Sequence, residues 1–280
     1  MRVGYYLPPL RDFIAPATQD TPMSPSSSAI SSVFHQASRE ARGLVEQLVR
    51  KKGESLDWVD DLRQLQEHFM DKSPQKAQRD CRSGCSACCM TVQVDITPIE
   101  AIAVRDYMKS YLDQEALQKV EQRLVHVTKR RIAQIRAQAP ATPLACAMLG
   151  MDGRCQIYPA RPVICSGVFS LDHYSCDEAR ENAQGGDYSP TVPLDNDALQ
   201  ATGGISGTLQ RVLVEKGLDG NLYELNSAVL VALRTPNVLA RYLAKEDLFR
   251  SAICTDAHSP PRKRNAPPPK FLRRQSNRSA

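Results

Sequence analysis

Apolar residues recur at intervals of three and four along much of the chain, the spacing that places side chains on one face of an α-helix. One such run lies within residues 33–48, and a second, within 56–69, follows the helix-ending Gly53. We therefore expect residues 33–77 to form a helical hairpin, with Trp58 helping its two helices to pack.

A change of period marks the next elements. Residues 90–96 alternate apolar and polar side chains, which predicts a brief strand. Thr97, Pro98 and Glu100 then give a helix start, because Thr caps the helix, Pro suits its first position and Glu can return a hydrogen bond to the cap. A further long, charged helix is expected to stop before Pro140.

The C-terminal half mixes irregular and helical patterns. Residues 139–195 carry prolines, glycines and four cysteines, and we expect them to be irregular. Helices are predicted at about 197–218 and 222–248, the first broken at the glycine pair 203–204 and the second bent near Pro236. The fold class expected is mainly α: a helical scaffold around an irregular, cysteine-rich core with little or no β-structure.

Both ends of the chain have compositions that resist regular structure. Residues 1–32 contain five prolines and a serine-rich run and are expected to be a disordered arm, unless translation begins at Met23. Residues 258–280 are expected to be a disordered basic tail. Between them we expect a cysteine-cluster domain at 78–180, after the hairpin, and C-terminal helices at 181–257 that pack on the same body.

The net charge of +5 comes from the tail, which holds seven basic residues and no acidic one. The rest of the chain is slightly acidic, so the body shows no basic face of the kind that binds nucleic acid. A contact with nucleic acid is therefore expected only of the tail, for which a solubilising role is the simpler interpretation.

Neither a membrane span nor a secretory leader is expected. No stretch approaches the roughly 18 uninterrupted apolar residues of a spanning helix, and prolines and charges interrupt the start of the chain. We infer a cytoplasmic protein. In a reducing compartment, clustered cysteines are more often metal ligands or redox groups than disulfides.

Eight of the nine cysteines fall within a stretch of fewer than a hundred residues. They form two sets along the sequence: Cys81, Cys85, Cys88 and Cys89, then Cys146, Cys155, Cys165 and Cys176. Crowded thiolates repel one another, and the usual reason to crowd them is a soft cation that deprotonates and binds them. Four ligands satisfy one tetrahedral zinc or one [4Fe-4S] cluster, so all eight are candidate ligands for one or two centres.

Cys88 and Cys89 are adjacent, and in an extended backbone neighbouring side chains point to opposite sides. Either the two feed neighbouring centres, or one binds the metal and the other supports it. Cys254 lies far from the cluster and is expected to be a partly buried lone cysteine.

Charged residues inside the cluster have two interpretations each. Arg161 can donate to thiolate sulfur and offset its negative charge, as can Arg82 and Arg154, or it can be a solvated side chain. His173 can replace a cysteine as a ligand, although a surface imidazole is the commoner role of such a residue.

The cysteine spacing supports a resemblance. The motif Cys81-x3-Cys85-x2-Cys88-Cys89, the strand-to-helix segment that follows it, and the motif that runs from Cys155 to Cys165 resemble the bacterial YkgJ-like cysteine-cluster family. The resemblance covers roughly residues 78–180 and implies a domain that chelates zinc or iron. It matches every clustered cysteine except Cys176, which is a candidate eighth ligand by position alone.

The chain departs from this family at two points without losing a sulfur. Ala147 and Met148 stand where the family usually has Pro and Phe, and Ser166 stands where Arg commonly follows the last motif cysteine. These changes affect the expected local backbone, and any anion contact of that Arg, more than metal binding.

We expect a metal-binding protein that holds zinc or an iron–sulfur cluster in a structural, metal-handling or protein-interaction role, with the protein partner unidentified. The alternative is an iron–sulfur-dependent protein lysine N-methylase, because some proteins similar to this family are named flagellin lysine N-methylases. The sequence offers no glycine-rich turn for a methyl donor. The first motif also has the spacing of radical S-adenosylmethionine enzymes, but Ala87 stands where those enzymes have an aromatic residue.

Overall fold

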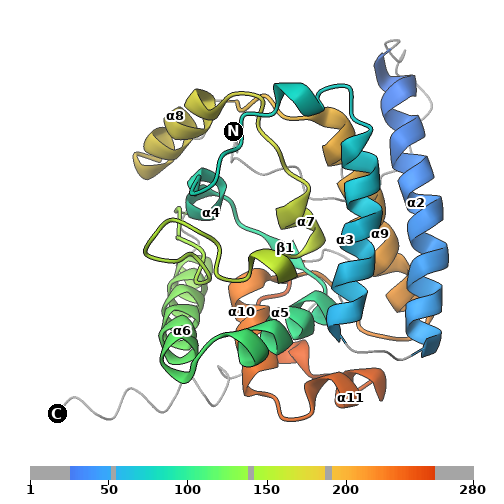
Figure 1. Cartoon of the computed structure of the whole chain (residues 1–280). Helices are drawn as coiled ribbons and strands as arrows, with labels where there is room; N and C mark the ends of the chain where they lie inside the picture. Colours follow the sequence, from blue (N-terminus) through green and yellow to red (C-terminus); the bar gives the residue numbers. More distant parts are fainter. Residues whose placement is uncertain (1–25, 52–54, 138–141, 187–190, 256–280) are drawn as a thin grey trace.

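The computed structural model describes residues 26–51, 55–137, 142–186 and 191–255, with side chains from residue 32 onward (Figure 1). The predicted mainly α fold is confirmed. The helices are α2 (Ser26–Lys51), α3 (Ser55–Asp71), α4 (Ala87–Thr91), α5 (Pro98–Tyr111), α6 (Gln114–Arg136), α7 (Val163–Ser166), α8 (His173–Gln184), α9 (Asn196–Glu215), α10 (Leu225–Arg234) and α11 (Val238–Leu243). Single 3-10 turns lie at Lys76–Gln78, Tyr158–Ala160 and Phe249–Ser251, and β1 (Asp95–Ile96) pairs antiparallel with β2 (Tyr223–Glu224).

Helices α2, α3 and α9 pack together as the upright group of Figure 1. The apolar stripe predicted for the first helix is buried, with Ala37, Ala41 and Val45 fully inaccessible. In α9, Gly204 lies so close to α2 that a Cβ atom there would sit 2.6 Å from the carbonyl oxygen of Phe34. The lack of a side chain therefore lets these two helix backbones approach each other.

The break predicted at the glycine pair 203–204 is wrong, because α9 runs through it without interruption. Glycine lowers intrinsic helix stability by about 1 kcal/mol, but here the close packing against α2 offsets that cost. The bend predicted near Pro236 is a full interruption: α10 ends at Arg234, and Asn237 has a left-handed backbone before α11 begins.

Other sequence-based boundaries also need correction. The strand predicted over 90–96 is confined to its end, because Met90 and Thr91 belong to α4, where the Thr91 hydroxyl bonds the Ala87 carbonyl at 2.8 Å. The region expected to be irregular contains the twelve-residue helix α8, whose polar surface gives little periodic signal. Helix α2 begins at Ser26, inside the arm expected to be disordered.

The remainder of the predicted arm, Gly53 and the predicted basic tail lie outside the described residues. Among the residues that the structure does describe, no helix is both long enough and apolar enough to span a bilayer.

The capping motif predicted at the start of α5 is confirmed. The Glu100 carboxylate accepts from the Thr97 amide at 2.9 Å. Its other oxygen accepts from the Val163 amide at 3.0 Å, so the same buried side chain also holds the first residue of α7.

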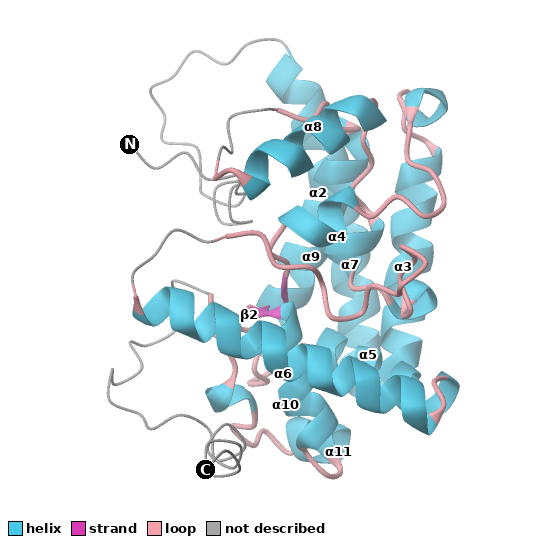
Figure 2. Ribbon diagram, turned by 90° about the vertical axis from the view of Figure 1, so that its left-hand side faces the viewer, coloured by secondary structure: helices cyan, strands magenta, loops and turns pink. Residues whose placement is uncertain are grey.

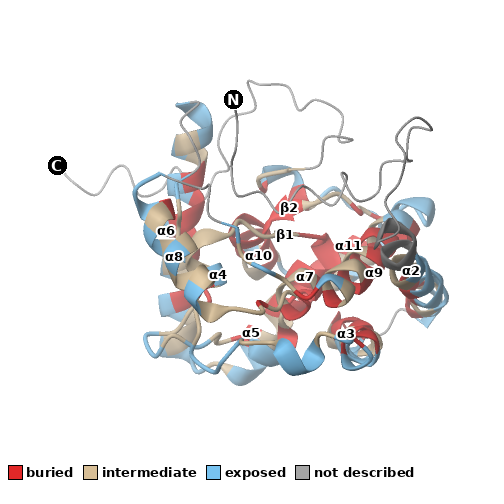
Figure 3. Cartoon of the chain, turned by 90° about the horizontal axis from the view of Figure 1, so that it is seen from above, coloured by how far each residue is buried: buried red, intermediate tan, exposed pale blue. Residues whose placement is uncertain are grey.

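The cysteine-rich segment shares the hydrophobic core of the scaffold. Met148, Ile157 and Val163, which lie between its cysteines, pack in one cluster with the buried faces of α2, α3, α5, α9 and α10. Figure 3 shows this interior in red, with α4 and α8 at its more accessible edge. The core therefore fixes the positions of the backbone segments that carry the sulfurs.

A buried polar network joins α3, α7 and α9. The amide nitrogen of Gln66 donates to the Val163 carbonyl and to the Thr202 hydroxyl, both at 2.8 Å, and its oxygen accepts from the Ser166 hydroxyl at 2.6 Å. A Cβ atom at Gly167 would lie 1.8 Å from the Thr202 oxygen and 2.1 Å from the Gln66 nitrogen. The network leaves no room for a side chain at this position.

We expect Gly167→Ala to lower the free energy of unfolding by about 2 kcal/mol, because the added methyl group must displace buried hydrogen-bonded groups. The measurement is urea denaturation followed by circular dichroism. Gly43→Ala is the matched control, since nothing lies within 4 Å of its Cβ position on α2. It should stabilise the protein by about 0.5 kcal/mol through helix propensity, and equal behaviour of the two variants would contradict the packing argument.

Asp95 on β1 is a half-buried residue opposite Glu224. Burial raises its pKa to about 6, opposed by the hydrogen bonds that it accepts from Gln93 and Thr255. An unfolded Asp has a pKa of about 3.9. Between these values the folded state binds the extra proton, so stability falls as the pH rises from 4 to 6.

Asp95→Asn should therefore stabilise the protein above pH 6, on the order of 1 kcal/mol, and have little effect at pH 4. Thermal unfolding of both proteins across this pH range is the measurement. A variant less stable than the parent at pH 8 would show that the charged carboxylate contributes favourably.

Candidate metal centre

The cysteine-bearing segments converge beside α4, α7 and α8 (Figure 2). The first segment, residues 81–89, lies against the second, where the Cys146 amide donates to the Cys89 carbonyl at 2.8 Å. The turn at Gly153, with φ of +75°, comes so close that a Cβ atom would lie 3.1 Å from the Gly84 carbonyl oxygen. Two glycine-containing turns thus bring together cysteines that are distant in sequence.

One group of thiols consists of Cys81, Cys85 and Cys176, referred to below as the outer group. The Ser170 amide donates to the Cys81 sulfur at 3.3 Å, and the Ser170 carbonyl accepts from the Asp80 amide at 2.9 Å. Burial raises the pKa of Cys176, and a hydrogen bond with the Ser170 side chain opposes that rise. Ser170 therefore forms hydrogen bonds with two of the three thiols, Cys81 and Cys176.

The electrostatic interactions define the outer group further. Burial raises the pKa of Cys81, and the Cys85 thiol raises it further. Cys176 experiences the same like-charge effect from Cys81 and Cys85. These three thiols are mutual neighbours at an accessible edge, where Cys81 is exposed and the other two are partly exposed.

A second group, Cys146, Cys155 and Cys165, consists of partly exposed residues whose sulfur atoms are strongly desolvated, and it is called the inner group. Burial raises the pKa of Cys146 to about 12 and that of Cys165 well above the ordinary thiol value. Burial also raises the pKa of Cys155. Buried thiols of this kind lose their protons only to a bound cation.

Cys88 lies between the two groups. After burial, repulsion from Cys146 and then from Cys88 makes the largest contribution to the raised pKa of Cys165. For the outer thiols Cys81 and Cys176, Cys88 is the weakest of the cysteine neighbours. Cys88 also raises the pKa of all three inner thiols, and Arg161, which acts on Cys155 and Cys165, acts on Cys88 as well, so we group Cys88 with the inner thiols.

Cys89 is placed differently from the other cysteines of the first motif. It acts on Cys88, where a hydrogen bond between the two side chains is the largest cause of the raised Cys88 pKa. Cys88, but not Cys89, is among the groups that raise the pKa of Cys146, Cys155 and Cys165. Helix α4 contains both residues, so their directions follow helical rather than extended geometry.

Arg161 is half-buried beside the inner group. Its guanidinium carbon lies 3.9 Å from the centre of the Tyr158 ring, and its charge opposes the rise in pKa of Cys155 and Cys165. Its Nε atom is buried without a hydrogen-bond partner. Another of its nitrogens donates to the Cys165 carbonyl at 3.5 Å. A guanidinium held beside the thiols fits a negatively charged centre, so the structure favours the supporting role over a solvated one.

The other two arginines considered from sequence lie elsewhere. Arg82 is exposed near Asp80, whose pKa it helps to lower. Arg154 is exposed in the turn opposite, where its carbonyl accepts from the Gly150 amide at 2.8 Å.

The cysteine sulfurs lie in one region of the protein, but they do not converge closely on a single point. Within residues 32–51, 55–137, 142–186 and 191–255, no three cysteine sulfurs all lie within 4.8 Å of one another. Zn–S bonds of about 2.3 Å in a tetrahedron would place sulfurs about 3.8 Å apart. No trio of sulfurs in these residues is therefore already at the spacing of one tetrahedral ion.

A hollow of about 300 Å³ opens beside the outer group, lined by Arg82, Cys85, His173 and Arg180 among others. Arg180 pairs with Asp177 at 3.3 Å, while its Nε atom is buried without a partner. The outer group is therefore accessible from this side.

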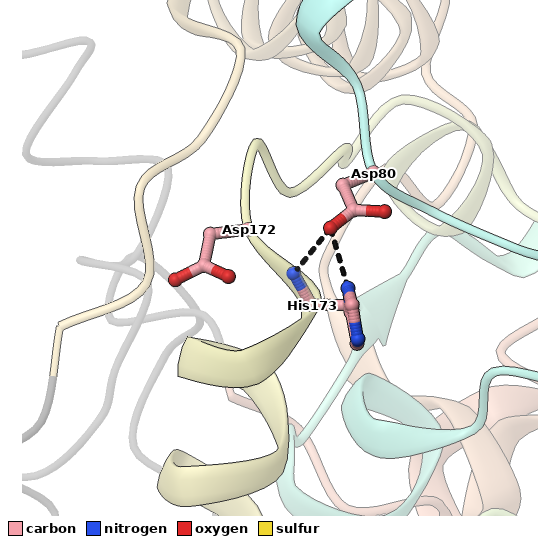
Figure 4. Close-up of side chains that lie close together, drawn as sticks. All are labelled: Asp80, Asp172 and His173. Carbon is pink, nitrogen blue, oxygen red and sulfur yellow. Dashed lines mark hydrogen bonds and ion pairs between the residues drawn. The ribbon is translucent and has the colours of Figure 1, made fainter.

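His173 begins α8, and its side chain is only 16% exposed, so it is not the surface imidazole expected from its sequence context. Figure 4 shows the Asp80 carboxylate between the backbone amide and the ring of His173. The amide lies 3.1 Å from Oδ2, and ring Nδ1 lies 2.5 Å from the same oxygen. Asp172 completes a trio whose ligand-type atoms all lie within 4.8 Å of one another.

Sequence reasoning missed Asp80 and Ser170, which organise the outer group. Asp80 directly precedes the candidate ligand Cys81, and this position in the sequence could have identified it. Ser170 belongs to no motif, and its role follows only from the long-range fold. Cys254 is half-buried, pairs along the backbone with Tyr223 and lies outside both thiol groups.

No match to this chain was found among curated proteins or among solved structures. A family model does match residues 80–183, a range that includes all eight clustered cysteines. The model is CxxCxxCC, described as a "putative zinc- or iron-chelating domain". This part of the chain therefore matches the cysteine-cluster family that its motifs resemble, and it carries a domain type associated with zinc or iron.

Proposed function

We propose that this chain binds iron, in the form of iron–sulfur clusters, through the outer and inner thiol groups. Zinc or iron chelation agrees with the family match. The preference for iron–sulfur clusters rests on one observation: the sulfurs gather in groups, yet no three of them in the described residues lie within 4.8 Å of one another.

The distance argument follows from how each type of centre uses its ligands. A mononuclear zinc draws four thiolates onto one ion, which places every pair of sulfurs at about 3.8 Å. In a [4Fe-4S] cluster each cysteine binds a different iron, so the ligand sulfurs are held apart by the body of the cluster. Loosely gathered thiols fit the second arrangement better.

The inner group supplies a complete ligand set when Cys88 joins Cys146, Cys155 and Cys165. Four thiolates would complete the ligand set of one centre, and Arg161 would offset part of their negative charge. We assign this centre a structural role, because it would tie the second cysteine segment to α4 and α7. The outer group, at the accessible edge, is the one suited to electron exchange or to contact with a partner.

Anaerobic purification should give a brown protein that contains iron and acid-labile sulfide in similar amounts, measured by elemental analysis and visible absorption on one sample. Cys254→Ser is the control and should keep the full iron content, because Cys254 lies outside both groups. A colourless protein with one or two zinc ions per chain, or a folded protein free of metal, would contradict the proposal.

The adjacent cysteines should differ in their contribution. Cys88→Ser is expected to lose roughly half of the bound iron, because one four-thiolate set becomes incomplete. Cys89→Ser should keep nearly all of it, since Cys89 acts mainly on Cys88. Iron and sulfide per folded chain are the quantities to compare; equal losses in the two variants would show that both cysteines are ligands.

A further inference from the structure

The two thiol groups differ by one ligand. With Cys88 assigned to the inner group, that group has four cysteines, whereas the outer group has only Cys81, Cys85 and Cys176. We propose that His173 supplies the fourth ligand of the outer centre through its Nε2 atom. This inference rests on the proposed iron–sulfur function and adds a nitrogen ligand to it.

The helix α8 places His173 correctly for this role. Residues three apart lie on the same face of a helix, so His173 and Cys176 share one face of its first turn. Helix α8 packs against α4, and His173 lines the same hollow as Cys85. The histidine thus lies where two of the three outer ligands meet.

Asp80 fixes the orientation of the imidazole. Its Oδ2 atom accepts from both the backbone amide and ring Nδ1 of His173 (Figure 4). A ring that donates from Nδ1 leaves the lone pair on Nε2, which is how carboxylates commonly orient metal-binding histidines. Asp80 directly precedes Cys81, so the orienting carboxylate and an outer thiol are carried by consecutive residues.

Ser170 ties the same residues together from the other side. Its amide donates to the Cys81 sulfur at 3.3 Å, and its carbonyl accepts from the Asp80 amide at 2.9 Å. Its hydroxyl accepts from the Asp172 amide at 3.0 Å, one residue before the histidine. The position of His173 relative to the outer thiols is therefore set by hydrogen bonds to the protein.

A separate cation site made of Asp80, Asp172 and His173 is the competing interpretation. Asp172 is occupied as the cap of α8, where it accepts from the amides of Tyr174 and Ser175. Asp80 is occupied by the two bonds to His173. The contacts of Asp80 hold the imidazole and those of Asp172 hold the start of α8, so we assign the two carboxylates to positioning His173.

The chemical consequence is a less negative outer centre. A neutral imidazole in place of a thiolate removes one negative charge from the ligand set, and histidine ligation is known to raise the reduction potential of iron–sulfur centres. The exposed Arg82 beside Asp80 acts in the same direction. The outer centre should therefore be easier to reduce than the inner one.

The test is pulsed electron paramagnetic resonance on the reduced protein, prepared with ordinary and with ¹⁵N-labelled histidine. We expect a nitrogen coupling in the parent that changes with the isotope. His173→Gln should lose this coupling together with roughly half of the iron, whereas His173→Cys should keep the iron, lose the coupling and show a lower reduction potential. His68→Gln is the control, because His68 lies on α3 beside Lys72.

Asp80→Asn provides a second variant that retains the imidazole, and a weakened or altered coupling is expected there. Iron-loaded parent protein without a histidine coupling would overturn the assignment, as would a coupling that persists in His173→Gln. These results differ from a failure of the proposed function, which would appear as parent protein without iron.

Discussion

The arrangement of the cysteine segments depends on two buried side chains that hold α7, the short helix that carries Cys165. Glu100 accepts a hydrogen bond from the first amide of α7, and Gln66 donates to the carbonyl of the same residue, Val163. These side chains belong to α5 and α3, so hydrogen bonds from two helices of the scaffold fix the backbone that carries Cys165. Leaving one of these buried polar groups without its hydrogen-bond partner would lower the free energy of unfolding by on the order of 1 to 3 kcal/mol. Other placements of α7 are therefore disfavoured.

The same network accounts for the residue that follows the last motif cysteine, where the chain differs from the family that its motifs resemble. Ser166 is buried and donates to Gln66, a place in which the longer Arg common in the family would have no room. Likewise Ala147 and Met148 are fully packed core residues, and the Ala147 amide bonds the Asn226 side chain at 3.0 Å. The residues at these departures are thus packed or hydrogen-bonded within the core of this protein.

Local sequence information predicted the features that arise from local physics. The periodic helices and the cap at Thr97 follow from spacing and capping, and cysteine clustering indicated the candidate site. Proline chemistry indicated a bend near Pro236, where the structure has a full interruption of the helix. The continuity of α9 through Gly204 was not predictable, because it depends on contact with α2, more than 150 residues away. Helix α8 was missed for a related reason: its stability comes from its cap and from α4 rather than from a strong apolar stripe. The division of the thiols into groups needed the long-range fold, since adjacent Cys88 and Cys89 look equivalent in sequence.

The hydrogen bonds around Ser170 also bear on how a cluster would enter the protein. They join Asp80, Cys81 and Asp172 through groups of the polypeptide alone, so their formation does not require a metal ion. A site that is already ordered loses little conformational entropy when it is filled. Together with the hollow that opens beside Cys85, this preorganisation would let a preassembled cluster be delivered from outside to a folded acceptor, without the chain having to fold around it.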